Sequence, residues 1–306
     1  MVDNTSHDPQ LRGGLLMLDR RQRTLARPAH LNGYGLFHGH DVAMTLLPAP
    51  EYHGIVFQRV DLAARVLIPA RIEYVVPQPR RTVLMRLGAQ VETVEHVLAA
   101  LAGLQIDNCL VQINAPECPN GDGSAQHFVE AIDSAGCVTQ SAPAAIVPVC
   151  ESLSIEDPAT GAAWSVRPTA DDSLRIEYEL HAPYPGCDRQ SFRLEITPES
   201  FISELATART FVRESEVQAL RAIGLGRRTT PHDLVVFDAD GQPIQNTLRR
   251  PDECVRHKLL DCLGDFALGG GQLSGDFRAR RTGHRHNHEL IRQIRSSQLG
   301  QRRRAA

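Results

Sequence analysis

The sequence contains 306 residues, of which 42% are hydrophobic and 23% charged, a composition typical of a soluble globular protein with one large domain or two ordinary ones. The formal net charge of −3 at pH 7 gives no reason to expect a nucleic-acid partner. Seven cysteines without a C-x-x-C pair argue against a disulfide framework and a thiolate metal site, and they favour a reducing cytosol.

The two ends of the chain carry no secretory or membrane signal. Residues 1–20 lack the basic-then-apolar pattern of a secretory signal and are predicted to be a leader strand or tail, and no stretch reaches the length of a membrane span. Residues 297–306 are predicted to be a basic, solvated tail, although an Arg-rich end could also bind nucleic acid. We expect a cytoplasmic monomer without a transmembrane segment.

The first predicted domain, residues 21–138, combines short strands with two helices. Gly103 is a plausible stop for the first helix, which is apolar throughout and therefore predicted to be buried. The predicted elements, in order, are short strands between 24 and 60 (among them 41–47), a helix over 93–103, a strand over 108–113, a Pro/Gly turn over 116–123 and a helix over 125–134.

Residues 139–145 are small, polar and contain a proline, so they are predicted to link the first domain to a second one, residues 146–296. The predicted elements of this second domain are strands over 146–156, 162–168, 173–181 and 189–196, a turn over 183–186, a helix over 212–223, a strand over 233–237, and helices over 251–268 and 283–297. The sequence therefore predicts an α+β fold of two similar domains, each a sheet packed with two main helices.

Two clusters of polar side chains interrupt predicted apolar helices. Glu95 and His96 open the first helix of the chain, and His257 and Asp261 are four residues apart, on one face of a later helix. A lone histidine on an apolar helix is more often an ordinary core residue. Two imidazoles and a carboxylate, however, are a three-ligand set of the kind that holds catalytic zinc, and an adjacent free carboxylate can accept a proton from water. The pattern indicates a metal-dependent hydrolase, with iron as an alternative to zinc.

Other polar residues near these clusters have ordinary explanations as well. Asp265 follows Asp261 by one turn and is either a surface acid or a carboxylate that orients the imidazole of His284. Lys258 is either a plain surface lysine or a contact to an anionic part of a substrate. His286 and His288 are expected to face solvent.

Two loop features are open to both structural and functional interpretations. Thr210 follows a strand and precedes a helix, so N-capping explains it about as well as catalysis does. Residues 120–124 have the composition of a turn and a cap, for which a structural role is favoured.

These residues lie in motifs that resemble the UDP-3-O-acyl-N-acetylglucosamine deacetylases, zinc amidases of bacterial lipid A biosynthesis. The resemblance runs in register from residue 22 to residue 294, with the motifs in the family's order. The motifs are residues 93–104, 106–108, 114–117, 122–125, 207–211 and 255–261, followed by Gly264-Asp265 and Gly283-His284. The resemblance implies two α+β domains that face each other, with one zinc ion and the substrate between them.

The resemblance also implies a role for each site residue. His96, His257 and Asp261 would bind zinc, and Glu95 would take a proton from the attacking water. His284 would pass a proton to the leaving amine.

Four further roles follow from the same resemblance. Asp265 would hold His284 protonated and aim it, and Thr210 would help to stabilise the tetrahedral oxyanion. The substrate contacts implied by the resemblance come from Lys258, Phe211 and Asn287.

The chain departs from the family pattern mainly in residues 212–232, the region that forms the acyl-chain passage in the family. Phe37-His38 also stands where the family has His first, and Arg280-Arg281 replaces a Tyr-Lys pair. Two other functions therefore stay open: a divergent amidase of this fold acting on another acylated sugar, and a non-catalytic protein that binds zinc or a nucleotide sugar.

Overall fold

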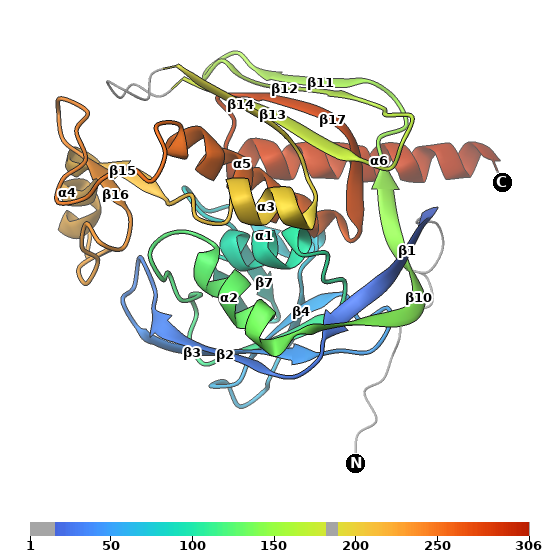
Figure 1. Cartoon of the computed structure of the whole chain (residues 1–306), viewed down its shortest axis with the longest axis horizontal. Helices are drawn as coiled ribbons and strands as arrows, with labels where there is room; N and C mark the ends of the chain where they lie inside the picture. Colours follow the sequence, from blue (N-terminus) through green and yellow to red (C-terminus); the bar gives the residue numbers. More distant parts are fainter. Residues whose placement is uncertain (1–15, 182–188, 306) are drawn as a thin grey trace.

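The computed structural model describes residues 16–181 and 189–305, and within these ranges the chain forms six α-helices and four β-sheets (Figure 1). The predicted α+β class is therefore confirmed. None of the helices in the described ranges combines the length and the apolar character that crossing a membrane would require.

The first half of the chain contains a five-stranded sheet in the order β2-β3-β9-β4-β5, a three-stranded sheet in the order β6-β7-β8, and two helices. The elements are β1 (Leu16–Leu25), β2 (Ala29–Tyr34), β3 (Asp41–Pro48), β4 (Ile55–Arg59), β5 (Leu67–Pro69), β6 (Val75–Val76), β7 (Val83–Arg86), β8 (Ala89–Glu92), α1 (Glu95–Gly103), β9 (Cys109–Ile113) and α2 (Gln126–Ala135).

The second half contributes most of a seven-stranded sheet, in which β1, β10, β17, β12 and β11 are neighbours and β13 joins β14 to β17. The elements are β10 (Cys137–Pro148), β11 (Leu153–Asp157), β12 (Ala162–Arg167), β13 (Leu174–Leu180), β14 (Gln190–Glu195), α3 (Pro198–Glu204), β15 (Phe211–Arg213), α4 (Glu214–Ala222), β16 (Val235–Phe237), α5 (Glu253–Phe266), β17 (Gln272–Arg280) and α6 (His284–Ala305).

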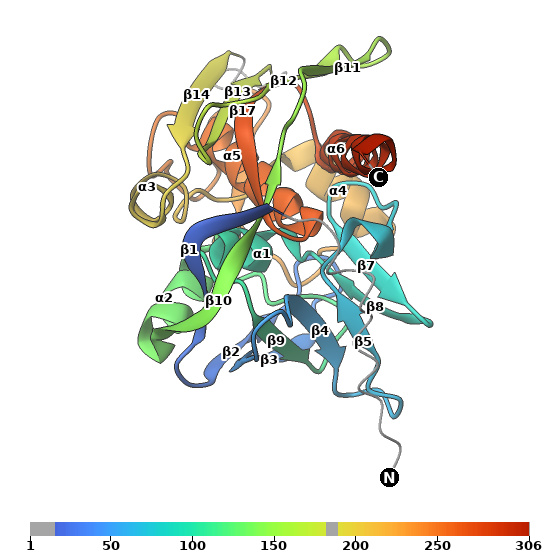
Figure 2. The same cartoon turned by 90° about the vertical axis from the view of Figure 1, so that its right-hand side faces the viewer.

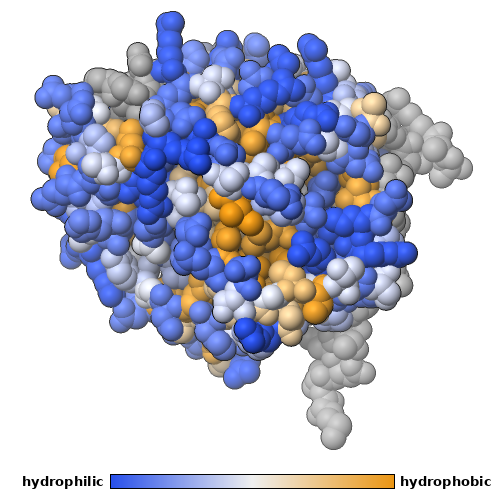
Figure 3. Space-filling view, in the orientation of Figure 1, coloured by the Kyte–Doolittle hydropathy of each residue, from blue (hydrophilic) through white to orange (hydrophobic). Residues whose placement is uncertain are grey.

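The two larger sheets lie on opposite sides of the molecule, and α1, α2, α5 and α6 lie between them (Figures 1 and 2). Figures 1 and 2 show α1 and α2 above the five-stranded sheet, and α5 and α6 beneath the seven-stranded sheet. Helix α1 packs against α5, and one hydrophobic cluster extends from Leu25 to Ile294. The face in Figure 3 is mostly hydrophilic, with apolar residues gathered near its centre. The two halves therefore share one core, and the contact between α1 and α5 is at its centre.

The contact between α1 and α5 depends on a glycine. A Cβ atom at Gly264 would lie 2.0 Å from the carbonyl oxygen of Glu95, so a side chain there would force the two helices apart. Thr93 turns the chain from β8 into α1 with a left-handed φ of 57°, which is rare for a β-branched residue. Its hydroxyl donates to the carboxylate of Glu117. These features fix where the first turn of α1 lies relative to α5.

Several local predictions were wrong. Residues 139–145, predicted to be a linker, lie inside β10, which pairs with β1 over most of its length. Residues 16–20, predicted to be a leader strand or tail, are indeed a strand, but it continues to Leu25 as β1. Helix α6 continues through the predicted tail to Ala305.

Other differences concern the second half. Helix α3 was not predicted. The helix predicted over 212–223 corresponds to α4, which begins two residues later than predicted because the short strand β15 precedes it. The turn predicted over 183–186 lies outside the described residues.

Candidate active site

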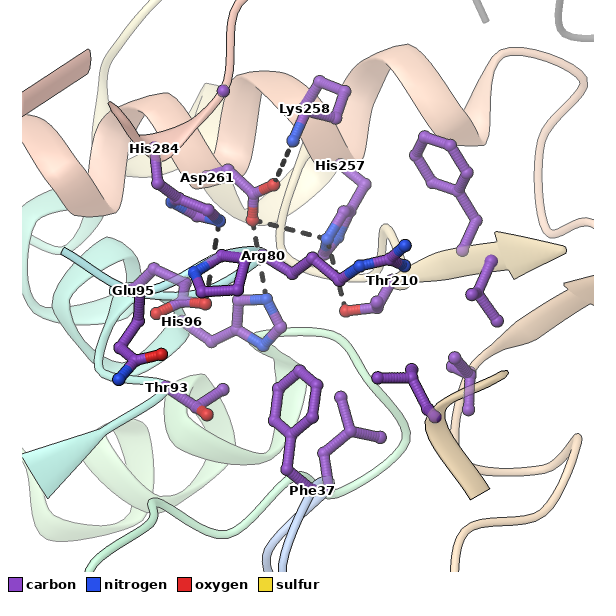
Figure 4. Close-up of a pocket in the computed structure, with 18 of the residues that line it drawn as sticks. Phe37, Arg80, Thr93, Glu95, His96, Thr210, His257, Lys258, Asp261 and His284 are labelled. Atoms are coloured by element: carbon purple, nitrogen blue, oxygen red, sulfur yellow. Dashed lines mark hydrogen bonds and ion pairs between the residues drawn. The ribbon is translucent and has the colours of Figure 1, made fainter. Parts of the chain in front are cut away.

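Helices α1 and α5 bring three predicted ligands together. His96 lies in the first turn of α1, and His257 and Asp261 lie one turn apart on α5. The Oδ1 atom of Asp261 is 3.6 Å from Nε2 of His96 and 3.3 Å from Nε2 of His257. One ligand atom from each residue lies within 4.8 Å of the others, and all three side chains are buried (Figure 4). This spacing is suitable for a single divalent cation.

The hydrogen bonds around the three residues leave the correct atoms available to a metal. The Nδ1 atom of His257 donates to the carbonyl oxygen of Ala208 at 3.1 Å, which directs the lone pair of Nε2 toward the cluster. Burial lowers the pKa of His257 to about 4, so its imidazole is neutral at pH 7, as a ligand must be. Lys258 binds Oδ2 of Asp261 at 2.7 Å, which leaves Oδ1 free.

The charge of Asp261 is maintained despite its burial. Desolvation alone would raise the pKa of its carboxyl group, but His257 and Lys258 hold that pKa well below the usual value. The donor set is therefore two imidazoles, of which that of His257 is neutral, and one carboxylate, which fits zinc with a position left for a further ligand. The same set is compatible with iron.

Glu95 and His284 lie next to this cluster and face each other (Figure 4). Oε1 of Glu95 is 3.8 Å from Nε2 of His284, too far for a direct hydrogen bond but close enough for both to contact one small group between them. Burial raises the pKa of Glu95, although His284 and His96 oppose the shift. Glu95 is therefore a stronger base than an exposed glutamate.

His284 is held from behind by Asp265. Its Nδ1 atom lies 2.8 Å from Oδ2 of Asp265, which is fully buried. Desolvation would lower the pKa of His284, but Asp265 and Glu95 outweigh it and raise that pKa to about 9. The imidazole is therefore protonated at neutral pH, with Nε2–H directed toward Glu95.

Thr210 is positioned by the loop over residues 120–124. Its backbone N–H donates to the carbonyl oxygen of Gly123 at 2.8 Å, and its Oγ1 lies 3.1 Å from the same oxygen and 3.2 Å from Nε2 of His257. The side chain of Asn120 donates to the carbonyl oxygen of Asp233 and Asp122 pairs with Arg249. The loop thus has the structural role that was favoured, and through Thr210 it also shapes the site.

A cavity of about 960 Å³ contains these groups. One part is apolar and is formed around β15, β16 and α4, where a separate hydrophobic cluster lines it; the cluster consists of Leu36, Val212, Val217, Leu234, Val236 and Ile244. Another part is basic and includes side chains from α6 and the residues before it, namely Arg281, Arg285, His286 and Arg292. Several residues of the divergent segment 212–232 therefore line the cavity.

Of the three predicted substrate contacts, two line the cavity and one does not. Lys258 and Phe211 line the cavity, and the ring of Phe211 meets that of His257 edge-on at 6.2 Å. Asn287 does not line it: its side chain is 1% exposed and donates to Oδ2 of Asp265 at 2.8 Å. In this location Asn287 supports Asp265, and its contact with substrate stays a prediction.

Sequence reasoning missed two residues at the site. His288, expected to face solvent, is buried, and its Nε2 lies 3.3 Å from Oδ1 of Asp265. The spacing of four from His284 could have indicated a shared helix face. Thr82 precedes β7, and its N–H donates to Oε2 of Glu95 at 3.0 Å. No local pattern marks Thr82, because its partners are distant in the sequence.

Comparison with known proteins agrees with this geometry. Residues 22–296 match the family model of the UDP-3-O-acyl N-acetylglycosamine deacetylases. Three similar proteins bear the name UDP-3-O-acyl-N-acetylglucosamine deacetylase. They come from Myxococcus xanthus strain DK1622 (42% identity, 90% of this chain, 86% of that protein), Geotalea uraniireducens strain Rf4 (38%, 89%, 88%) and Pseudomonas entomophila strain L48 (37%, 90%, 90%).

The range matched by the family model, residues 22–296, includes the metal cluster, the Glu95–His284 pair and the apolar part of the cavity. By both measures, the chain belongs to the UDP-3-O-acyl N-acetylglycosamine deacetylase family.

Proposed function

We propose that the protein removes acetate from a UDP-linked 3-O-acyl-N-acetylglucosamine, as the names of its relatives state for them. The observation that carries this proposal is the buried triad of His96, His257 and Asp261 beside Glu95 and His284. A metal cluster of two imidazoles and a carboxylate, with a base and a protonated imidazole beside it, suits the hydrolysis of an amide.

We infer that zinc is the resident ion, held by the triad through Nε2 of each imidazole and Oδ1 of Asp261. When bound in such a site, zinc acidifies a water molecule and polarises a carbonyl oxygen. Structural zinc usually has four protein ligands, so three ligands favour a catalytic role. Lys258 keeps Asp261 charged and turned toward the imidazoles.

The protein's own groups account for the proton transfers. Glu95 accepts a proton from the water that attacks the acetamide carbonyl carbon. His284 donates its Nε2 proton to the amide nitrogen as the C–N bond breaks, so that acetate and a free amine leave. Thr210 can turn its hydroxyl from Gly123 toward the developing oxyanion, a type of contact worth roughly 100- to 1000-fold in rate.

The two parts of the cavity support a substrate that has an acyl chain and a diphosphate. The apolar cluster around β15 and β16 suits a hydrocarbon chain, and the basic side chains Arg281, Arg285 and Arg292 suit phosphate oxygens. Phe211 lines the cavity beside His257 and can pack on the sugar ring. The six described cysteines that are free thiols support a reducing compartment such as the cytoplasm.

The proposal is tested by measuring acetate release from UDP-3-O-acyl-N-acetylglucosamine with a defined metal content. We expect Glu95→Gln to keep its zinc and to lose at least about 100-fold in kcat, because a general base typically contributes that much. A Glu95→Gln enzyme that releases acetate at the wild-type rate would show that another group is the base. Equal turnover of substrates with and without the 3-O-acyl group would favour an amidase for a different sugar.

A further inference from the structure

Thr82 is fully buried, and it contacts both Glu95 and Asp265, the carboxylate behind His284. Its backbone N–H donates to Oε2 of Glu95 at 3.0 Å, and its hydroxyl donates to Oδ1 of Asp265 at 2.5 Å. Glu95 lies on α1 and Asp265 lies on α5, whereas Thr82 lies in the segment between β6 and β7. One residue from a third element therefore joins the carboxylate that acts as the base to the carboxylate behind His284.

Asp265 is surrounded by four donors, which equals the number of lone-pair sites on a carboxylate. Oδ2 accepts from Nδ1 of His284 and from Nδ2 of Asn287, both at 2.8 Å. Oδ1 faces the Thr82 hydroxyl and, at 3.3 Å, Nε2 of His288. The Thr82 contact is the shortest of the four, and it is the one that comes from outside α6, so it helps to fix the plane of the carboxylate and hence the direction of the His284 ring.

The hydroxyl of Thr82 has one proton and can donate only once. Nε2 of His288 lies 3.0 Å from the same oxygen, closer than it lies to Asp265. If Nε2 of His288 carries the proton, the hydroxyl oxygen accepts from it and gives its own proton to Asp265. The resulting chain runs from His288 through Thr82 and Asp265 to His284 at the reaction centre.

We propose that Thr82 is a positioning residue that holds Glu95 and the Asp265–His284 pair in register, and that His288 acts on the reaction through the Thr82 hydroxyl. This proposal rests on the proposed deacetylation. Packing and hydrogen bonding by the Thr82 side chain can be separated experimentally, since valine would fill the same volume without the hydroxyl. The residue therefore makes two separable contacts, one through its backbone and one through its side chain. Only the hydroxyl is removed by Thr82→Val, because the backbone N–H to Glu95 remains.

The test compares the zinc-loaded enzymes Thr82→Val, Thr82→Ser and His288→Phe in steady-state acetate release. We expect Thr82→Val to lower kcat by about 10- to 100-fold, the usual loss when a partner behind a site residue is removed, with KM within about twofold of wild type. Thr82→Ser keeps the hydroxyl and should restore most of kcat. His288→Phe should lower kcat less, and His288→Gln, which keeps an N–H donor, should restore it.

A double-mutant cycle tests the order of the chain. His288→Phe should have little further effect in the Thr82→Val background, since the hydroxyl it orients is already absent. Thr24→Val is the matched control, because Thr24 is also a buried threonine with two hydrogen bonds, to the carbonyl of Asn108 and from the N–H of Ala49, but lies far from the site. Thr24→Val should lower the free energy of unfolding without lowering kcat.

Three outcomes would overturn the proposal: an unchanged kcat in Thr82→Val, an equal loss in Thr82→Ser, or an equal effect of His288→Phe in both backgrounds. If Thr82→Val does not fold, the proposal is tested by comparing His288→Phe with His288→Gln. Equal kcat for these two variants would reject the proposal. Absence of acetate release by the wild-type enzyme would instead reject the proposed deacetylation, so the two failures are distinguishable.

Discussion

Replacing Gly264 by alanine tests whether the close approach of α1 and α5 positions the active site. An added Cβ would lie 2.0 Å from the carbonyl oxygen of Glu95, where an ordinary contact needs about 3.4 Å, so the helices must separate by about 1.4 Å (3.4 − 2.0). Overpacking of this kind costs roughly 1–3 kcal/mol of folding free energy. Alanine gains about 1 kcal/mol over glycine in helix propensity, which offsets part of that cost.

The effect on catalysis should exceed the effect on stability. Glu95 and His96 move with α1, whereas Asp261 and Asp265 move with α5, so separation of the helices changes every distance across the site. A misplacement of about 1 Å can cost about 100-fold in rate. We therefore expect Gly264→Ala to lower kcat by about 100-fold while the midpoint of thermal unfolding falls by only a few degrees.

The measurements are acetate release, zinc content and thermal unfolding of the same preparation. Gly269→Ala is the matched control, because its added Cβ would meet Leu273 at 3.5 Å, an ordinary contact, just beyond the end of α5. It should keep wild-type kcat. A Gly264→Ala enzyme with wild-type kcat and a raised unfolding temperature would refute the argument, since only the gain in helix propensity would then have been realised.

Three other predictions follow from the site. First, kcat should stay constant up to about pH 9 and fall about tenfold per pH unit above it, because the proposed proton donor, His284, has a pKa raised to about 9. A pH profile without a basic limb would contradict this role. Second, chelation of the metal should abolish acetate release but leave the circular dichroism spectrum folded, because only ligand-linked stability of about 3 kcal/mol is lost and Lys258 still pairs with Asp261; an unfolded spectrum would indicate a structural metal. Third, Val217→Trp should fill the apolar part of the cavity and lower kcat/KM about tenfold or more for long acyl chains but not for short ones; an equal loss for both lengths would exclude this cavity as the acyl site.

The parts of the site that could be predicted are those determined by helix periodicity. His257 and Asp261 are one turn apart, and a helix is rigid enough for that spacing to bring both side chains to one face. His96 and Glu95 were identified because polar residues interrupt an apolar helix, where burial demands a partner. Their roles in binding a metal and in proton transfer stay predictions.

The parts that could not be predicted depend on contacts between distant segments. Residues 139–145 have the composition of a linker, but β1 offers them a strand partner, and pairing outweighs their weak local preference. Thr82 is linked to Asp265 across 183 positions of the sequence. His288 was assigned to solvent because it alternates with His284 and His286, although its spacing of four from His284 indicates the same helix face.

The proposal that Glu95 is the base is supported by the structure independently of the family. Glu95 and Asp265 are both fully buried carboxylates near His284, so burial alone cannot distinguish them. Asp265 accepts from His284, Asn287 and the Thr82 hydroxyl, and His284 and His288 hold its pKa below the usual value against the desolvation that would raise it. Glu95 accepts one hydrogen bond, from the N–H of Thr82, and burial raises its pKa. Two carboxylates whose pKa values are driven apart are suited to different tasks, and of these two only Glu95 lines the cavity.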